Sequence, residues 1–240
     1  IAIYDLKGKL LGIPCYQFFK ADPKKMPVTS LTIGIDNLDM IRKKVRGAGN
    51  FKALKIKLGS SYDKEIINTV REESNVPLYI DANQGWTDKQ EALEMIHWLA
   101  EKGTEFIEQP MDKNNADENA WITAHSPIPI IADEAMQRLT DLEKLSGIYH
   151  GINIKLMKCT GLLEASKIIT KARALNLKIM VGCMSETSCG IMAGAAIAPL
   201  CDWADLDGPW LITNNPFKNP ELVDGKIQLR NQAGLGLSFN

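Results

Sequence analysis

Eight short apolar segments rich in β-branched residues recur along the chain at intervals of roughly 25 residues, and most precede a helical pattern. They lie at 28–35, 53–58, 78–82, 105–109, 129–134, 152–157, 178–183 and 203–207. Strands that alternate with helices over such units pair in parallel through crossover helices. The pattern predicts an α/β fold closed into a (β/α)₈ barrel of the TIM type. An open doubly wound sheet is the alternative, but no glycine-rich dinucleotide fingerprint follows the first segment.

Two helix starts can be placed from their capping residues. Asp36 precedes an amphipathic pattern and is the expected N-cap of the helix after the first strand. Thr87 and Gln90 have the spacing of a capping box, and Gly103 is expected to end that helix.

Three regions are expected along the chain. Residues 26–225 would form the barrel, and residues 226–240 have a strand-and-turn pattern that follows the eighth unit. The chain opens within a helical pattern, because Ile1, Ile3 and Leu6 are apolar and no capping residue precedes them. We therefore expect residues 1–25 to be the last helix and linker of a preceding domain, and the chain to be the carboxy-terminal part of a longer protein.

Composition narrows the class of protein further. The formal net charge of −1 gives no basis for a nucleic-acid partner. No apolar run approaches the roughly 18 residues that a membrane span needs. The five cysteines are odd in number and lack CxxC spacing, which indicates reduced thiols and a cytoplasmic location.

Charged residues close five of the predicted strands. From Lys57 the steps are 24 residues to Asp81, 27 to Glu108, 25 to Asp133 and 22 to Lys155. The carboxyl ends of barrel strands meet at one mouth, where catalytic residues of such barrels sit. These five side chains are therefore expected to converge on one site.

Three of these residues are carboxylates on successive strands, and they predict a metal site. Asp81, Glu108 and Asp133 would repel one another unless a cation neutralised them. Oxygen ligands without histidine or cysteine favour Mg²⁺, with Mn²⁺ as the alternative. Three separate surface or salt-bridged acids are the simpler interpretation, but their common register argues against it.

The lysines interrupt apolar strands where side chains should be buried or face the mouth. Lys57 and Lys155 lie on strands two and six, so they would face each other across the barrel. Burial, other ammonium groups and a metal would lower their pKa values, as a general base requires. Lys55 lies deeper and is expected to assist electrostatically. Lys158 is a rival to Lys155, but it follows the strand and has the opposite parity.

Two opposed bases around a metal suit one reaction in particular. One lysine would remove a proton α to a carboxylate, the metal would stabilise the enediolate, and the other lysine would return a proton to the opposite face. A barrel that only binds metal or peptide is the alternative from another functional class, and it would not need the opposed bases.

The eighth strand carries a further acidic pair. Asp205 and Asp207 share one face of the strand, and at the mouth they would attract a cation such as a substrate ammonium group. A local turn or helix cap at Asp207 is the alternative interpretation. Ser185, after the seventh strand, is a candidate for the pocket lining.

The ordered motifs KIK, DANQGW, IEQP, IADEA and NIKLMKCTG resemble the enolase superfamily, specifically its muconate-lactonising subgroup, over nearly the whole chain. The resemblance implies Mg²⁺ on Asp81, Glu108 and Asp133, with Lys57 and Lys155 as the acid/base pair. The DLDGP segment is similar to that of the dipeptide epimerases, in which the two aspartates bind the α-ammonium of a dipeptide.

That resemblance implies epimerisation at the α-carbon of the carboxy-terminal residue of a dipeptide, such as alanyl-glutamate. The alternatives within the subgroup are o-succinylbenzoate synthase, N-acylamino acid racemase and muconate cycloisomerase, whose substrates lack a free ammonium group. Members of the superfamily also carry an amino-terminal capping domain that closes the barrel. Closure would therefore need a domain outside this chain, and a homo-oligomer is left open.

Overall fold

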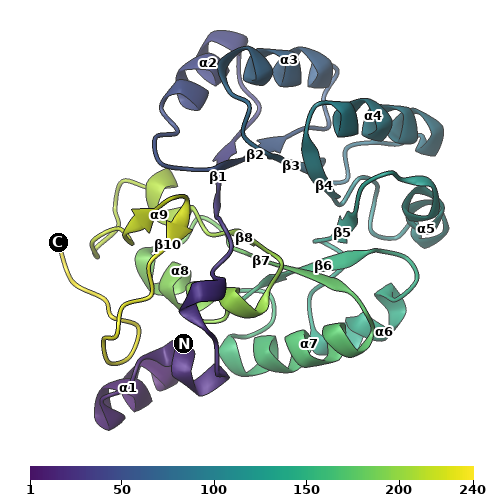
Figure 1. The fold of residues 1–240 in the computed structure, drawn as a ribbon. Coiled ribbons are helices and arrows are strands. Elements are labelled where there is room, and N and C mark those ends of the chain that lie inside the picture. The colour runs from purple at the N-terminus through teal and green to yellow at the C-terminus, as the bar shows by residue number, and fades with distance from the viewer.

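The computed structural model describes residues 1–240, and its centre is an eight-stranded parallel barrel (Figure 1). Strands that follow one another in sequence are neighbours in the sheet, in the order β1 to β8. Their bounds are β1 Ser30–Ile33, β2 Ala53–Lys57, β3 Leu78–Asp81, β4 Thr104–Glu108, β5 Ile130–Ala132, β6 Gly151–Lys155, β7 Lys178–Gly182 and β8 Trp203–Asp205. The predicted barrel is confirmed.

The seam between β8 and β1 closes the ring. Thr29 and Ala204 form a parallel bridge, and the Leu206 backbone N–H donates to Thr29 Oγ1 at 2.8 Å. With β8 returning to β1 in this way, the open doubly wound alternative is excluded.

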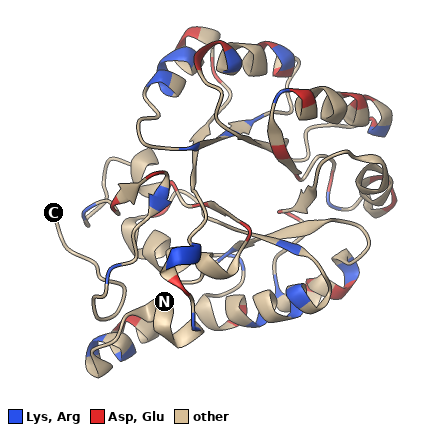
Figure 2. Ribbon diagram, viewed as in Figure 1, with Lys and Arg blue, Asp and Glu red and all other residues tan.

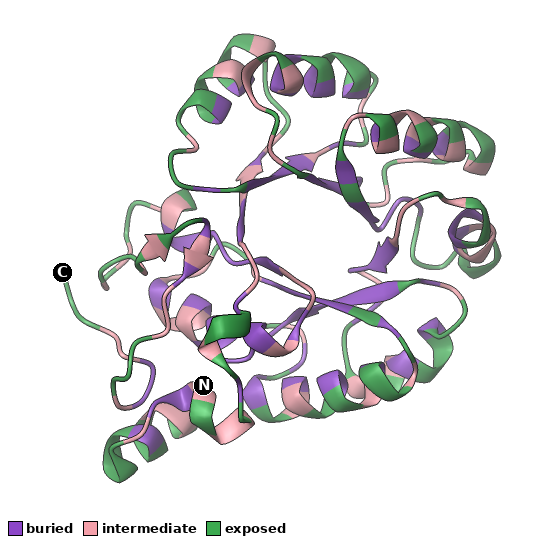
Figure 3. Ribbon diagram, viewed as in Figure 1, coloured by how far each residue is buried: buried purple, intermediate pink, exposed green.

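Helices follow the strands and form the outer ring of the barrel (Figure 1). Their bounds are α2 Leu38–Arg46, α3 Asp63–Glu73, α4 Lys89–Glu101, α5 Ala116–His125, α6 Leu142–Leu145, α7 Leu162–Ala174, α8 Ser188–Ala195 and α9 Gly208–Leu211. Short 3₁₀ turns are η1 Cys15–Phe19, η2 Pro23–Lys25, η3 Leu139–Asp141 and η4 Ala198–Leu200. Helices α2 to α7 turn apolar faces to the strands and exposed faces with charged residues outward, whereas α8 and α9 carry no charged residue (Figures 2 and 3). No helix combines the length and apolarity that crossing a membrane would require.

Both predicted N-caps were wrong by one residue. The cap of α2 is Asn37, whose side chain accepts from Met40 N, while Asp36 accepts from Asn37 N instead. The cap of α4 is Asp88, whose side chain accepts from the backbone N–H groups of Gln90 and Glu91. Adjacent residues that can both cap leave the start of a helix ambiguous by one position.

Two layers of side chains fill the inside of the barrel. The first is apolar, with Tyr79 and Phe106 ring centroids 4.6 Å apart and Trp203 packed 4.9 Å from Phe106. Side chains two residues further along a strand point the same way. The second layer therefore lies directly above the first and consists of Lys55, Asp81, Glu108, Asp133, Gly182 and Asp205. The polar layer at the carboxyl ends of the strands therefore packs on an apolar layer that contains aromatic rings.

The two ends of the chain lie side by side beside the barrel. Helix α1 (Ala2–Leu11) ends earlier than the helical pattern suggested, because Gly12 takes a left-handed conformation with φ 69°. The Leu235 N–H donates to Asp5 Oδ1 at 2.8 Å, which ties the carboxy-terminal segment to α1. Before that segment, β9 (Leu222–Val223) and β10 (Lys226–Ile227) form an antiparallel hairpin.

Candidate active site

The three predicted metal ligands come together at the barrel mouth. Asp81 ends β3, Glu108 ends β4, and Asp133 follows β5 directly. All three are buried, and one carboxylate oxygen from each lies within 4.8 Å of the others. Parallel register places them together, since Lys57, Asp81 and Glu108 are aligned across β2, β3 and β4. This acidic triad could bind a metal ion.

Glu108 has the features of a ligand that requires a cation. Its Oε1 accepts a hydrogen bond from Asn153 Nδ2 at 2.6 Å. Its Oε2 is fully buried and accepts no hydrogen bond. Lys55 Nζ lies 2.7 Å from that Oε2 as an ion-pair contact only. Burial and the charge of Asp81 raise the pKa of Glu108 to about 8. The donor set of this structure therefore fits a hard divalent cation.

Lys55 lies at the centre of the acidic groups. Its Nζ is 2.9 Å from Asp205 Oδ2 and 3.1 Å from Asp81 Oδ2, and only 2% of the side chain is exposed. Burial acts to lower the pKa of Lys55, but the surrounding carboxylates outweigh it and hold the pKa well above its ordinary value. A permanently charged, multiply paired lysine suits electrostatic support and not proton removal.

Lys57 and Lys155 project from strands on opposite sides of the ring, β2 and β6. Lys57 Nζ lies 2.6 Å from Asp81 Oδ2, and Lys155 Nζ lies 2.7 Å from Asp133 Oδ2. Each lysine thus contacts a different member of the acidic triad. The two ammonium groups therefore flank the triad from opposite sides.

The carboxylates around Lys155 act against the lowered pKa that was expected for it, an expectation that also counted a bound metal ion. Burial does lower it, but the charges of Glu108 and Asp133 raise the pKa of this group by more, so the net shift is upward. The sequence-based expectation counted burial, other ammonium groups and a metal ion, and it gave too little weight to the carboxylates.

Lys158 also reaches the site, although the parity argument had set it aside. Its Nζ donates to Asp133 Oδ1 at 2.5 Å and to the Asp133 carbonyl at 2.7 Å. It follows β6, where the backbone turns, so strand alternation no longer predicts its direction. Burial lowers the pKa of Lys158. Asp133 therefore lies between two ammonium groups.

The acidic pair on the eighth strand has two different environments. Asp205 has a charged or polar partner on each oxygen, because Ser30 Oγ donates to its Oδ1 at 2.8 Å and Lys55 Nζ donates to its Oδ2 at 2.9 Å. Asp207 accepts from the Thr32 N–H at 2.6 Å through Oδ2, while its Oδ1 has only the Cys183 thiol at 3.8 Å. Asp207 is the N-cap residue of α9 and its carbonyl accepts from the Trp210 N–H at 2.9 Å, as the turn or helix-cap alternative expects, but its side chain makes no cap hydrogen bond.

Burial and the neighbouring Asp205 charge raise the pKa of Asp207 to about 6. A buried carboxylate with one poorly satisfied oxygen can accept a cationic partner. Ser185 lies on the loop between β7 and α8, where its side chain is exposed and makes no hydrogen bond within the chain.

Two supporting residues were not predicted from the sequence. Gln109 is buried, and its Oε1 accepts from the Asp133 and Ala135 N–H groups at 3.1 Å each. Asn153, also buried, donates to Glu108 from β6, two strands away from β4. A polar residue inside an apolar strand signals an inward position for Asn153. Nothing in the pattern of hydrophobic residues distinguishes Gln109 from a loop residue.

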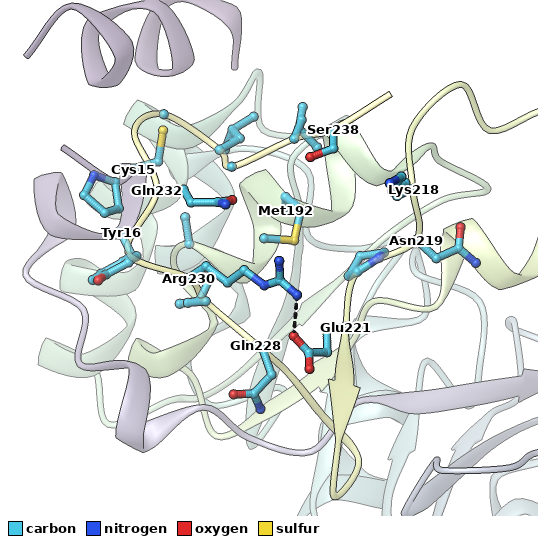
Figure 4. Close-up of a pocket in the computed structure, with 18 residues that line it drawn as sticks. Cys15, Tyr16, Met192, Lys218, Asn219, Glu221, Gln228, Arg230, Gln232 and Ser238 are labelled. Carbon is cyan, nitrogen blue, oxygen red and sulfur yellow. Dashed lines mark hydrogen bonds and ion pairs between the residues drawn. The ribbon is translucent and has the colours of Figure 1, made fainter. Parts of the chain in front are cut away.

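A cavity also lies away from the barrel mouth. It has a volume of about 140 Å³ and lies between the carboxy-terminal segment, α8 and the residues around Cys15 (Figure 4). Glu221 and Arg230 form an ion pair of 2.7 Å there. None of the triad, lysine or aspartate groups at the mouth lines this cavity.

Residues 38–240 match the family model described as "Enolase C-terminal domain-like". An L-Ala-D/L-Glu epimerase from Bacteroides thetaiotaomicron is 53% identical over 99% of this chain and 62% of its own length. A hydrophobic dipeptide epimerase from Roseobacter litoralis is 39% identical over 91% of this chain and 67% of its own length.

A solved dipeptide epimerase from Cytophaga hutchinsonii, complexed with Mg and the dipeptide D-Ala-L-Val, has a TM-score of 0.90. The two proteins are 30% identical, and the match covers the whole of this chain and 68% of the solved one. The chain spans 62% and 64% of two curated relatives, an L-Ala-D/L-Glu epimerase and an L-Ala-D/L-amino acid epimerase.

Proposed function

We propose, from the premise that this chain belongs to the enolase C-terminal domain-like family, that it is the catalytic barrel of a Mg²⁺-dependent dipeptide epimerase. The observation that carries the proposal is the pair of lysines, Lys57 and Lys155, on opposite strands beside one acidic triad. A site that only bound peptide would have no need of two opposed bases.

In the proposed reaction the two lysines act on opposite faces of one carbon. A neutral lysine takes the α-proton of the carboxy-terminal residue, and the C–H electron pair moves into the substrate carboxylate to give an enediolate. The other lysine, as an ammonium group, delivers a proton to the opposite face, so configuration is inverted. Lys55 adds fixed positive charge beneath the triad.

Asp81, Glu108 and Asp133 would hold the metal. Mg²⁺ is the ion we propose, because all three donors are carboxylates and relatives are complexed with Mg; Mn²⁺ suits the same donors. When bound, the cation supplies positive charge that offsets the charge developing on the substrate carboxylate.

Asp207 is proposed to receive the substrate ammonium group through Oδ1, with Ser185 lining the same side of the mouth. Asp205 would act differently from the sequence-based expectation. Its oxygens are already paired with Ser30 and Lys55, so it contributes negative charge and closes the seam. This division supports a free dipeptide over the N-acylated substrates of the alternative reactions.

Residues 1–25 are proposed to be the end of a capping domain, residues 26–225 the barrel, and residues 226–240 an appendage. Relatives longer than this chain are consistent with a further domain that completes the site. The five free thiols support the proposed cytoplasmic location.

A substrate panel tests this proposal. The full-length protein with Mg²⁺ should epimerise one or more L,L-dipeptides and leave N-succinyl amino acids, muconate and o-succinylbenzoate precursors unchanged. Chiral chromatography of the hydrolysed products measures the outcome. Turnover of an N-succinyl amino acid without turnover of any dipeptide would assign the barrel to an alternative reaction.

Replacing Asp207 by asparagine should weaken dipeptide binding selectively. Loss of a buried charge pair costs about 2 kcal/mol or more, so KM should rise roughly thirtyfold or more. The amide oxygen can still accept from Thr32 N–H, so the fold should be retained. KM for a dipeptide and for its N-acetyl derivative separates the outcomes, because equal effects on both would indicate a structural role.

The same carboxylate should set an acidic limit to activity. Since the pKa of Asp207 is raised to about 6, the group is protonated below that pH and loses its attraction for an ammonium ion. We expect kcat/KM for dipeptides to decrease as the pH is lowered through about 6. Asp207→Asn should remove this decrease from the pH profile. An unchanged pH profile in the variant would contradict the assignment.

A further inference from the structure

The loops that follow β2 and β3 are joined by a buried carboxylate that the proposed reaction does not use. Asp63, in the first turn of α3, is buried and accepts several hydrogen bonds. Three come from its own loop, from Gly59 N at 3.0 Å, Ser60 N at 2.8 Å and Ser60 Oγ at 3.0 Å. The fourth comes from the next loop, where Trp86 Nε1 donates at 3.0 Å. One side chain therefore fastens two loops.

The same two loops touch backbone to backbone. A Cβ atom on Gly85 would lie 2.5 Å from Gly59 Cα, and a Cβ on Gly59 would lie 2.8 Å from the Ala82 carbonyl. Gly59 also has φ +106°, a conformation that other residues rarely adopt. Glycine at both positions permits the close approach that brings the Trp86 indole to Asp63.

These loops lead directly into the catalytic groups of one side of the site. Gly59 is separated from Lys57 only by Leu58, whose N–H donates to the Asp81 carbonyl at 2.9 Å. On the other loop, Asn83 N donates to Asp81 Oδ1 at 3.0 Å. Between the two loops, Lys57 Nζ lies 2.6 Å from Asp81 Oδ2. A shift of either loop would change that contact.

Lys155 is connected to these two loops only indirectly. It projects from β6 on the far side of the ring, and its ion-pair partner Asp133 follows β5. The backbone N–H of Asp133 is held by the Gln109 side chain, and the loop after β3 reaches Gln109 only through its backbone, where the Gln84 N–H donates to the Gln109 carbonyl at 2.8 Å. A disturbance at Asp63 or Trp86 should therefore act more directly, and more strongly, on Lys57 than on Lys155.

We propose that Asp63 and Trp86 are positioning residues that fix Lys57 against Asp81 and thereby govern proton transfer at one face of the substrate. This inference rests on the proposed epimerase function. Misplacement of a catalytic group by about 1 Å can cost on the order of a hundredfold in rate. The expected consequence is an asymmetric loss of activity, which a general loss of stability would not produce.

The test measures α-proton exchange of each substrate epimer in D₂O with the full-length protein and Mg²⁺. Lys57→Ala and Lys155→Ala first assign each epimer to its base, because each variant should lose exchange of one epimer. The test variant is Trp86→Phe, which keeps the ring and removes the N–H donor. Trp98→Phe is the matched control, since Trp98 is half-buried on α4 and its indole N–H makes no hydrogen bond within the chain. Asp63→Asn is a second variant. It replaces one of the two accepting carboxylate oxygens by an NH₂ group, which cannot accept from the N–H donors of the two loops.

We expect Trp86→Phe and Asp63→Asn to slow exchange of the Lys57-dependent epimer by about tenfold or more relative to the other epimer. The ratio of the two rates in one preparation does not depend on how much protein is folded, and Trp98→Phe should leave it unchanged. An unchanged ratio in both test variants would overturn the positioning role while the epimerase function stands. Absence of exchange in the unmodified protein would instead reject the proposed function itself.

Discussion

Lys155→Ala is expected to abolish epimerisation, while α-proton exchange of one epimer survives. A positioned general acid or base contributes roughly 10²–10⁴-fold, so turnover should fall at least about a hundredfold. Lys57, on the opposite strand, keeps its own contact with Asp81 and can still remove and return a proton on its face. Exchange of each epimer in D₂O, followed by NMR, measures the effect.

Lys57→Ala should give the mirror result and lose exchange of the other epimer. Lys167→Ala is the matched control, because Lys167 is exposed on α7 and makes no ion pair. If both active-site variants retained epimerisation, or if both lost exchange of the same epimer, the two-base account would be wrong.

Glu108→Gln should remove the metal from the site. Loss of a residue that only orients a ligand costs about 10–100-fold in metal affinity, so loss of a ligand should cost at least about a hundredfold. Within the triad, Glu108 is also the member with a buried oxygen that accepts no hydrogen bond, although Lys55 Nζ lies 2.7 Å from it. Calorimetric titration of Mg²⁺ into the full-length protein measures the affinity directly.

The matched control is Glu105→Gln, which makes the same change on the same strand. Glu105 is exposed and accepts from Trp203 Nε1, a bond that the amide oxygen of glutamine can also accept. Unaltered Mg²⁺ affinity in Glu108→Gln would show that the triad is not the metal site.

Much of the fold was predictable because the strands combine two strong patterns. Their apolar runs mark the buried barrel, and their charged last residues mark its mouth. Asp81 and Glu108 could be placed from these patterns alone, and they end β3 and β4 as expected. The helix starts were less certain, since Asp36 and Asn37 are both suitable caps and only the fold decides between them.

The details of the site depended on contacts between residues far apart in the sequence. Lys158 was set aside by strand parity, yet it contacts Asp133 from beyond the strand end. The raised pKa of Lys155 follows from carboxylates whose distances no pattern supplies. Asp205 and Asp207 look equivalent in the sequence, and only the structure shows that Asp205 already contacts Ser30 and Lys55.

The position of solvent deuterium in the product tests the central claim most directly. The full-length protein should be incubated in D₂O with Mg²⁺ and an L,L-dipeptide that it turns over, and the product analysed by NMR and mass spectrometry. Two opposed lysines predict one deuterium, at the α-carbon of the carboxy-terminal residue of the epimerised product. Epimerised product without deuterium, or with deuterium at the amino-terminal residue, would contradict the mechanism.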